Sequence, residues 1–125
     1  MTTATVPIPT PGLRPGLPKS FKRATTVYAI AFDMDIDQLR THYGDPYNNA
    51  YLEIRRVLQQ HGFTWQQGSM YFGGPDVTAV GCVIAAQELA RSLRWFAASV
   101  RHIRMLRIEE LNDLMPAVQL AVGPG

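Results

Sequence analysis

Residues 27–32 read Val-Tyr-Ala-Ile-Ala-Phe, a run of β-branched, aromatic and small residues that is followed at once by Asp33. Its length and almost continuous apolar character are typical of a strand that is covered on at least one face and central in its sheet. An acid beside such a strand costs free energy unless water, a partner or a metal ion meets it. We therefore expect a central strand over 27–32, with Asp33 at its end.

Two helical patterns follow this strand. Asp35 and Gln38 have the capping-box spacing, so we expect Asp35 to cap a short helix over 36–43 and the Gln38 side chain to reach back. Asp45 and Pro46 are typical of a second helix start, with the acid as cap and the proline in the first turn. The residues that recur at helical spacing and predict its buried stripe are Tyr47, Ala50, Tyr51, Ile54, Val57 and Leu58.

The middle of the chain predicts a hairpin. Gly62 is placed to end the second helix in the left-handed conformation. Residues 63–67 and 69–72 are then expected to form two strands joined by a tight turn around Gly68.

The last part of the chain predicts one more helix and one more strand. Asp76 is expected to cap a helix that runs to about Leu93. Residues expected to line this helix where it packs on the sheet are Ala79, Val80, Val83, Ile84, Ala86 and Leu89. Residues 103–108 are typical of a strand, and residues 112–118, which contain Pro116, predict a weaker edge strand or an exchanged terminal arm.

These elements follow one another as strand, helix, strand, strand, helix, strand. Two helices on one face of a four-stranded antiparallel sheet is the ferredoxin-like arrangement. The predicted fold class is therefore α+β, a ferredoxin-like βαββαβ sandwich with an extra C-terminal strand or arm. We expect residues 25–120 to form this domain, residues 1–24 a disordered tail rich in proline, and residues 121–125 a flexible C-terminus.

Composition excludes several classes of protein. A hydrophobic content of 46% excludes a disordered chain, and no apolar run approaches the roughly 18 residues of a membrane helix. The first ten residues lack the positive charge and apolar core of a secretion signal. One cysteine, Cys82, can form neither an internal disulfide nor a cysteine-rich metal site. We therefore expect a cytoplasmic protein without a membrane partner.

The net charge of +2 is unevenly distributed along the chain. Arg14, Lys19, Lys22 and Arg23 precede the predicted fold. The remaining eight basic residues, all arginine, face ten acids, so the folded part carries about −2. Its bulk charge gives no indication of nucleic-acid binding, and the positions of the arginines become the relevant observation.

Asp33 is the first candidate for chemistry. Asp35 is explained as a helix cap, and Asp37 falls in the first helical turn, where the helix dipole favours an acid. Asp33 has no such local explanation. It is either a functional acid or a strand-end acid that accepts a hydrogen bond from a loop N–H, and the pattern alone leaves both open.

Arginines crowd the stretch after the third helix: Arg91, Arg94, Arg101, Arg104 and Arg107. Arginine suits phosphate because its planar fork donates two parallel hydrogen bonds. On a regular strand, side chains three residues apart face opposite ways, as Arg104 and Arg107 would. The alternative is a solvated face neutralised by Glu109 and Glu110.

The other candidate side chains have structural explanations. The aromatic residues that could stack on bases, but whose spacing favours core or dimer contacts, are Tyr28, Tyr43, Tyr47, Tyr51, Trp65 and Tyr71. His42, His61 and His102 form no ligand pair and are interpreted as structural, although His42 is near enough to Asp33 in sequence to assist proton transfer. Cys82 is expected to be buried and inert.

Several strings resemble the virulence-associated protein D family. They are YAIAFD at 28–33, YNNAY at 47–51, GFTWQQGS at 62–69 with its continuation to Phe72, and IRMLRIEE at 103–110, together with shorter matches at 95–96 and 99–101. The similarity extends from about Val27 to Val118, nearly all of the predicted fold.

This resemblance implies a ferredoxin-like homodimer, related in fold to the small CRISPR-associated ribonucleases. It also implies endoribonuclease activity on RNA, often as the toxin paired with an antitoxin protein. Asp33 is then the catalytic acid, one per subunit near the dimer axis, acting as general base or as ligand if a metal such as Mg²⁺ is used. Arg101, Arg104, Arg107 and Ser69 would bind the RNA phosphates.

The chain departs from the family at its front, where members begin close to the residue before Tyr28. Val27 stands where an initiator methionine is expected, so translation from a valine-type start codon is one hypothesis for residues 1–26. Two functions other than ribonuclease remain open. They are a catalytically silent dimer that binds nucleic acid or protein, and a small-molecule regulatory domain with a ligand between subunits.

Overall fold

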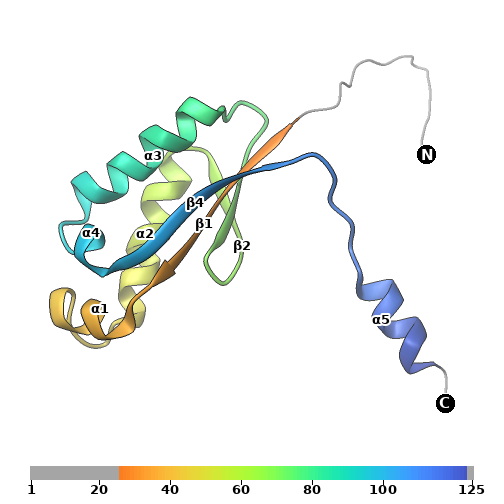
Figure 1. The fold of residues 1–125 in the computed structure, drawn as a ribbon, viewed down its shortest axis with the longest axis horizontal. Coiled ribbons are helices and arrows are strands. Elements are labelled where there is room, and N and C mark those ends of the chain that lie inside the picture. The colour runs from red at the N-terminus through yellow and green to blue at the C-terminus, as the bar shows by residue number, and fades with distance from the viewer. Residues whose placement is uncertain (1–25, 124–125) are drawn as a thin grey trace.

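The computed structural model describes residues 26–123. Its four strands form one antiparallel sheet in the order β2-β3-β1-β4, and α2 and α3 cover one face of it (Figure 1). This is the ferredoxin-like arrangement, so the predicted fold class is confirmed. The elements are β1 (Val27–Met34), α1 (Ile36–His42), α2 (Asn48–Gln60), β2 (Phe63–Gln67), β3 (Met70–Gly73), α3 (Ala79–Ser92), α4 (Phe96–Ser99), β4 (Val100–Ile108) and α5 (Met115–Val122).

Strand β1 is central, as its apolar sequence predicts. Its alternate residues Ile30, Phe32 and Met34 are buried and belong to the core between the sheet and the helices. Because neighbouring side chains on a strand point to opposite faces, Ala31 and Asp33 lie on the other face. The helix residues that complete the core are Ala50, Ile54, Val57 and Leu58 from α2, and Cys82, Ala85 and Leu89 from α3.

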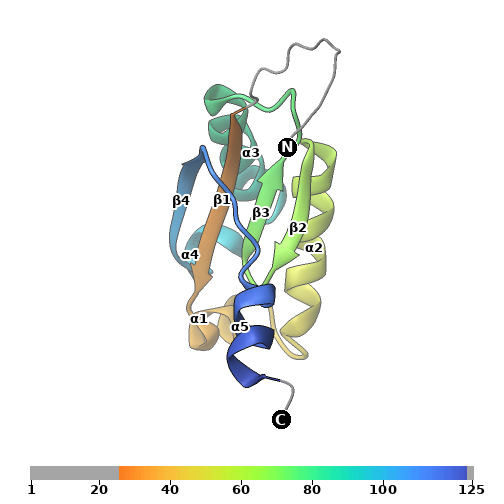
Figure 2. The same ribbon diagram turned by 90° about the vertical axis from the view of Figure 1, so that its right-hand side faces the viewer.

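The face of the sheet away from α2 and α3 is called here the open face. Figure 2 looks onto it, with the strands in front of α2 and α3. Residues paired across antiparallel strands point to the same face. The β1 partners on this face are therefore Met70 and Phe72 from β3, and His102, Arg104 and Leu106 from β4. Ala29, the small residue between Phe72 and Leu106, is fully buried even though no core helix covers it.

Two glycines adopt the positive φ that the turn pattern predicts. Gly62 has φ 89° between α2 and β2, and Gly68 has φ 50° in the β2–β3 turn. The left-handed region is unfavourable for residues with a Cβ atom, so glycine fits both positions. The predicted hairpin is confirmed by the pairing of β2 with β3.

The start of α1 is confirmed in part. The Asp35 Oδ1 atom accepts a hydrogen bond from the Gln38 backbone N–H at 3.1 Å, as a cap should. The prediction that Gln38 reaches back to the Asp35 N–H is wrong. That N–H donates instead to the Ser99 carbonyl at 2.8 Å, so a tertiary contact with α4 takes the place of the reciprocal bond.

The predicted caps of α2 and α3 are wrong. Helix α2 begins at Asn48 and has no side-chain cap, while Asp45 lies 3.7 Å from the Arg40 Nε atom. Helix α3 is capped by Thr78, whose Oγ1 accepts the Gly81 N–H at 3.0 Å. The physical reason is a turn closed by the hydrogen bond from Val77 N–H to Gly74, which places Asp76 before the helix start.

The outward side of α3 also differs from prediction. Val80, Val83 and Ile84 were expected on the packed side of this helix but are exposed. The buried side carries Cys82, Ala85 and Leu89, whose spacing of three and four residues defines one face of a helix. Since α3 is apolar on most sides, its sequence does not say which side meets the sheet.

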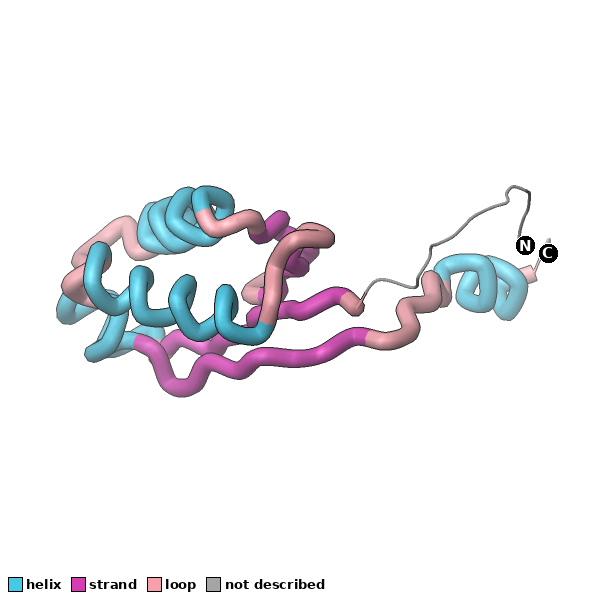
Figure 3. Tube along the Cα trace, turned by 90° about the horizontal axis from the view of Figure 1, so that it is seen from above, coloured by secondary structure: helices cyan, strands magenta, loops and turns pink. Residues whose placement is uncertain are grey.

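The C-terminal segment is a helix, so the predicted edge strand is wrong. The Asp113 Oδ1 atom accepts the Met115 N–H at 2.9 Å, and Pro116 lies in the first turn, where a missing N–H costs nothing. Helix α5 stands clear of the two layers (Figures 1 and 3). Residues 1–25 and 124–125 lie outside the described part, so the disordered tail, the valine start and the flexible C-terminus stay predictions. No helix between residues 26 and 123 is long and apolar enough to span a membrane.

Candidate active site at the end of strand β1

Asp33 lies on the open face near the end of β1. Its side chain is 49% exposed, so solvent and a ligand can both reach the carboxylate. Within residues 26–123, no backbone N–H donates to this carboxylate. The structural explanation left open by the sequence, an acid held by a loop N–H, therefore finds no support in this part of the chain.

A bulge in β4 brings Arg101 and His102 to Asp33. The β1–β4 register pairs Asp33 with His102 and Met34 with Val100, which leaves Arg101 as an extra residue on β4. A β-bulge bends its strand and changes the direction of the extra side chain. Both Arg101 and His102 can then approach the same carboxylate, which two successive residues of a regular strand could not do.

The side-chain distances describe one connected cluster. The Arg101 Nη1 atom donates a hydrogen bond to Asp33 Oδ2 at 3.4 Å, and His102 Nε2 lies 3.8 Å from the same oxygen. Arg101 Nη2 is 3.8 Å from Asp35 Oδ2, so one guanidinium bridges two carboxylates. These distances are longer than those of tight ion pairs, and a phosphate group could replace Asp33 or Asp35 as the partner of Arg101.

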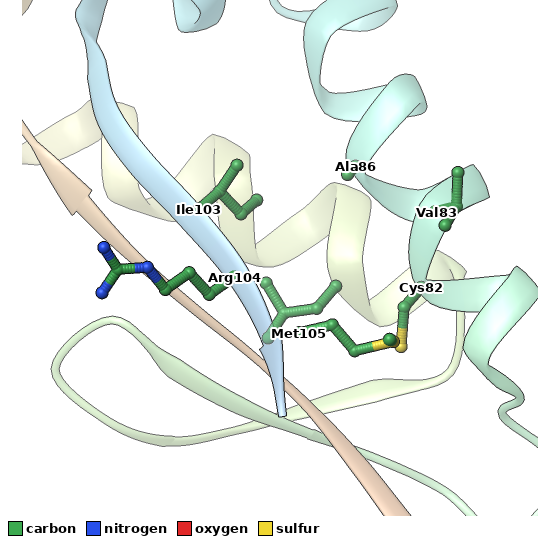
Figure 4. Close-up of a pocket in the computed structure, with 7 residues that line it drawn as sticks. Cys82, Val83, Ala86, Ile103, Arg104 and Met105 are labelled. Atoms are coloured by element: carbon green, nitrogen blue, oxygen red, sulfur yellow. The ribbon is translucent and has the colours of Figure 1, made fainter. Parts of the chain in front are cut away.

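The two other predicted arginines lie on opposite faces. Arg104 pairs with Ala31 and shares the open face with Asp33, whereas Arg107 pairs with Tyr28 on the helical face. Arg107 Nε also lies 3.1 Å from Glu109 Oε2. Figure 4 shows the Arg104 guanidinium pointing away from α3. The structure thus brings Arg101 and Arg104 to the side of the sheet that carries Asp33, but not Arg107.

Ser69 lies next to the same end of β1. Its backbone carbonyl accepts the Phe32 N–H at 3.1 Å, one residue before Asp33. Together with Ala31, Gly68 and Met70, it lines an open hollow of about 380 Å³. The hollow lies beside the end of β1, but Asp33 does not line it. The role of Ser69 in binding RNA therefore stays a prediction.

The histidine brought to Asp33 is His102, and sequence reasoning interpreted it as structural. His42, the residue suggested for proton transfer, lies on α1 with its Nε2 atom 3.2 Å from Gln38 Oε1. An antiparallel β1–β4 pair follows from the βαββαβ order, so a neighbour of Asp33 on β4 could have been expected. The bulge that makes this neighbour His102 and adds Arg101 has no signal in the sequence.

Two groups near the sheet keep their protons at neutral pH. Burial raises the pKa of the Tyr51 hydroxyl, with smaller contributions from Tyr47 and from the negative charge of Asp33. Burial also raises the pKa of the Cys82 thiol, which fits the expectation of a buried and inert cysteine. Tyr51 is therefore a hydrogen-bond donor rather than a base.

The site offers few side chains that could bind a metal ion. Residues 26–123 contain no group of three or more His, Cys, Asp or Glu side chains placed to hold an ion. Mg²⁺ can keep several waters and be held by one or two carboxylates plus substrate phosphates, so it does not require a larger group of donors. Asp33 is the residue that would hold it, with Arg101 turning to the phosphate.

Fold and site together define an α+β protein of ferredoxin-like fold, with an exposed acid and a cationic strand on its open face. No protein-family model matches the chain. It is 46% identical to endoribonuclease VapD 2 of Riemerella anatipestifer over 93 residues, 74% of this chain and 99% of the relative. Identity is 45% with the endoribonuclease VapD homolog of Helicobacter pylori, over 77% of this chain and 100% of the relative. The chain is 43% identical to endoribonuclease VapD of Dichelobacter nodosus, over 74% of this chain and 98% of the relative.

The chain therefore belongs to the virulence-associated protein D (VapD) family, as its sequence strings indicate. The matched length of 93–96 residues is about that of the described fold.

Because Asp33 is half-exposed, we expect it to contribute little to the stability of the fold. We expect Asp33→Asn to change the free energy of unfolding by less than about 1 kcal/mol, because half-exposed ion pairs contribute about 0–1 kcal/mol. Asp35→Ala removes a helix cap and should cost about 1 kcal/mol or more. Urea unfolding of the two variants measures both values. A loss above about 2 kcal/mol for Asp33→Asn would make Asp33 a structural acid.

Proposed function

We propose that this chain is an endoribonuclease that cleaves RNA at the open face, with Asp33 as the essential acid. The observation that carries the proposal is a half-exposed carboxylate beside Arg101 and His102, near the end of the central strand β1. The relatives named as endoribonucleases support the same activity.

In the proposed reaction, the Asp33 carboxylate takes the proton of the attacking oxygen, which belongs to a neighbouring ribose hydroxyl or to water. A P–O bond forms to that oxygen, and the P–O bond to the leaving ribose breaks. Protonated His102 supplies a proton to the leaving oxygen. Arg101 and Arg104 donate hydrogen bonds to the phosphate oxygens as negative charge develops. If Mg²⁺ takes part, Asp33 would hold it instead of acting as the base, and the ion would polarise the phosphate.

The active form is proposed to be a homodimer built on the open face. Leu106 is 41% exposed there, beside the partly buried Phe72 and Met70. These apolar side chains surround the small residues of β1 and offer a surface onto which a second sheet can pack at about 10 Å. Asp33 lies at one end of this surface, so each subunit would bring its carboxylate to the rim of the interface.

Substitution of Asp33 tests the proposed function. We expect purified Asp33→Asn protein to bind a mixed-sequence RNA but to cleave it at least about 100-fold more slowly than wild type, the usual contribution of a general base. Asp37→Asn is the matched control, since it makes the same change at an exposed acid on α1. Reactions with magnesium and with a chelator determine the metal requirement. Equal cleavage by wild-type and Asp33→Asn protein would overturn the assignment, and no cleavage by either folded protein would favour the binding-only alternative.

The two faces of β4 provide a second test. We expect Arg101→Ala to lower kcat/KM for RNA at least tenfold, because one donor to a developing phosphate charge is removed. Arg107→Ala should have less than a twofold effect, since Arg107 lies on the helical face and pairs with Glu109. Steady-state cleavage of a labelled RNA measures both. A larger loss of kcat/KM for Arg107→Ala than for Arg101→Ala would place the phosphate site on the helical face.

We further propose that the chain acts as the toxin of a toxin–antitoxin pair, with the resemblance to the VapD family as support. Induced expression in a bacterial host without the antitoxin is expected to slow growth and shorten the lifetime of cellular RNA. Asp33→Asn protein expressed to the same level should do neither. Growth arrest by both proteins would separate toxicity from cleavage.

A further inference from the structure

Helix α5 lacks a packing surface in the described fold. It has eight residues, none of them charged, and none of its side chains is buried. An isolated helix of this length is unstable in water, because helices shorter than about 12–15 residues are marginal even with the best composition. Exposed apolar clusters of this kind mark interaction sites. Its large apolar residues, together with those just before it, are Leu111, Leu114, Met115, Val118, Leu120 and Val122.

A groove of matching chemistry lies between α3 and β4. Figure 4 shows Val83 and Ala86 on α3 across from Ile103 and Met105 on β4, with the Cys82 sulfur in the same hollow. The cavity measures about 120 Å³, close to the roughly 150 Å³ that holds a benzene molecule, so one aliphatic side chain fits. Val83 is 53% exposed and Met105 is 48% exposed. The side chains of this groove carry no charge, because Arg104 turns its guanidinium away from it.

The position of α5 favours a second copy of the chain over its own groove. In Figures 1 and 2, α5 lies on the open-face side of the sheet, opposite α2 and α3. Residues 109–114 connect it to β4 and can span about 20 Å at 3.3–3.6 Å per residue. A second sheet packed on the open face would lie about 10 Å away. The connector 109–114 is therefore long enough to carry α5 past this sheet toward the helical side of the second copy.

We propose that α5 of one copy docks into the groove between α3 and β4 of a second copy, so that the two chains exchange C-terminal helices. This inference rests on the proposed homodimer but not on ribonuclease activity. It accounts for the exposed residues of α3 and of α5 with one contact. It also makes residues 109–114 the crossing segment and joins each helical layer to the other chain.

Disulfide formation between different chains tests the exchange. All proteins carry Cys82→Ala, so that each chain has only its introduced cysteine. Chains with Val83→Cys are mixed and oxidised with chains carrying Met115→Cys, Val118→Cys or Leu120→Cys, which sample three sides of α5. We expect at least one mixture to give tenfold more covalent heterodimer than its control, in which Leu52→Cys on the exposed side of α2 replaces Val83→Cys.

The outcomes separate this inference from the proposed dimer. Sizing of wild-type and Leu106→Glu protein first reports whether the open face holds a dimer. A wild-type monomer would overturn the dimer and the exchange together. A dimer in which no α5 cysteine reaches position 83 of another chain would overturn the exchange alone. A further protein carries Val83→Cys and one α5 cysteine on the same chain. A disulfide within its monomer, with none between mixed single-cysteine chains, would show that α5 returns to its own groove and would also overturn the exchange.

Discussion

The pairing of β1 with β4 is the constraint on which the rest of the structure depends. It aligns nearly the full length of both strands, and its regular part makes one face apolar for the helices and the other open. The ladder shifts by one residue where β1 reaches Asp33. A bulge that redirects side chains is common beside active sites. Here it adds Arg101 and His102 to the surroundings of Asp33, so the site is a property of the register rather than of any local motif.

The two faces of the sheet have different roles. The helical face supplies stability through buried residues such as Ile30 and Phe32, packed on α2 and α3. On the open face, Asp33, His102 and Arg104 share one side with small and apolar residues that can meet a second sheet. The same alternation that buries the core thus separates the arginines, leaving Arg104 near the acid and Arg107 with Glu109.

Much of this arrangement could be predicted from the sequence. The apolar run at β1 predicted a central strand, and the glycines at 62 and 68 predicted the helix end and the hairpin turn, because period and positive φ are local properties. The predicted orientation of α3 is wrong because this helix is apolar nearly all round. For residues 112–118 the edge strand is wrong, since Asp113 and Pro116 suit a helix start, whereas the exchanged arm stays a prediction. The cluster at Asp33 depends on a bulge between residues far apart in the chain, and neither propensity nor spacing reports such a shift. The family resemblance pointed to Asp33 but not to His102.

In the proposed function, RNA is bound and cut at the bulged end of the β1–β4 pair. Photo-crosslinking of a 4-thiouridine RNA to the non-cleaving Asp33→Asn protein, with the crosslinked peptides identified by mass spectrometry, tests it most directly. We expect crosslinks to the segment 101–104 and to the turn that contains Ser69. Crosslinks confined to α2, α3 or the Arg107 side of β4 would contradict it.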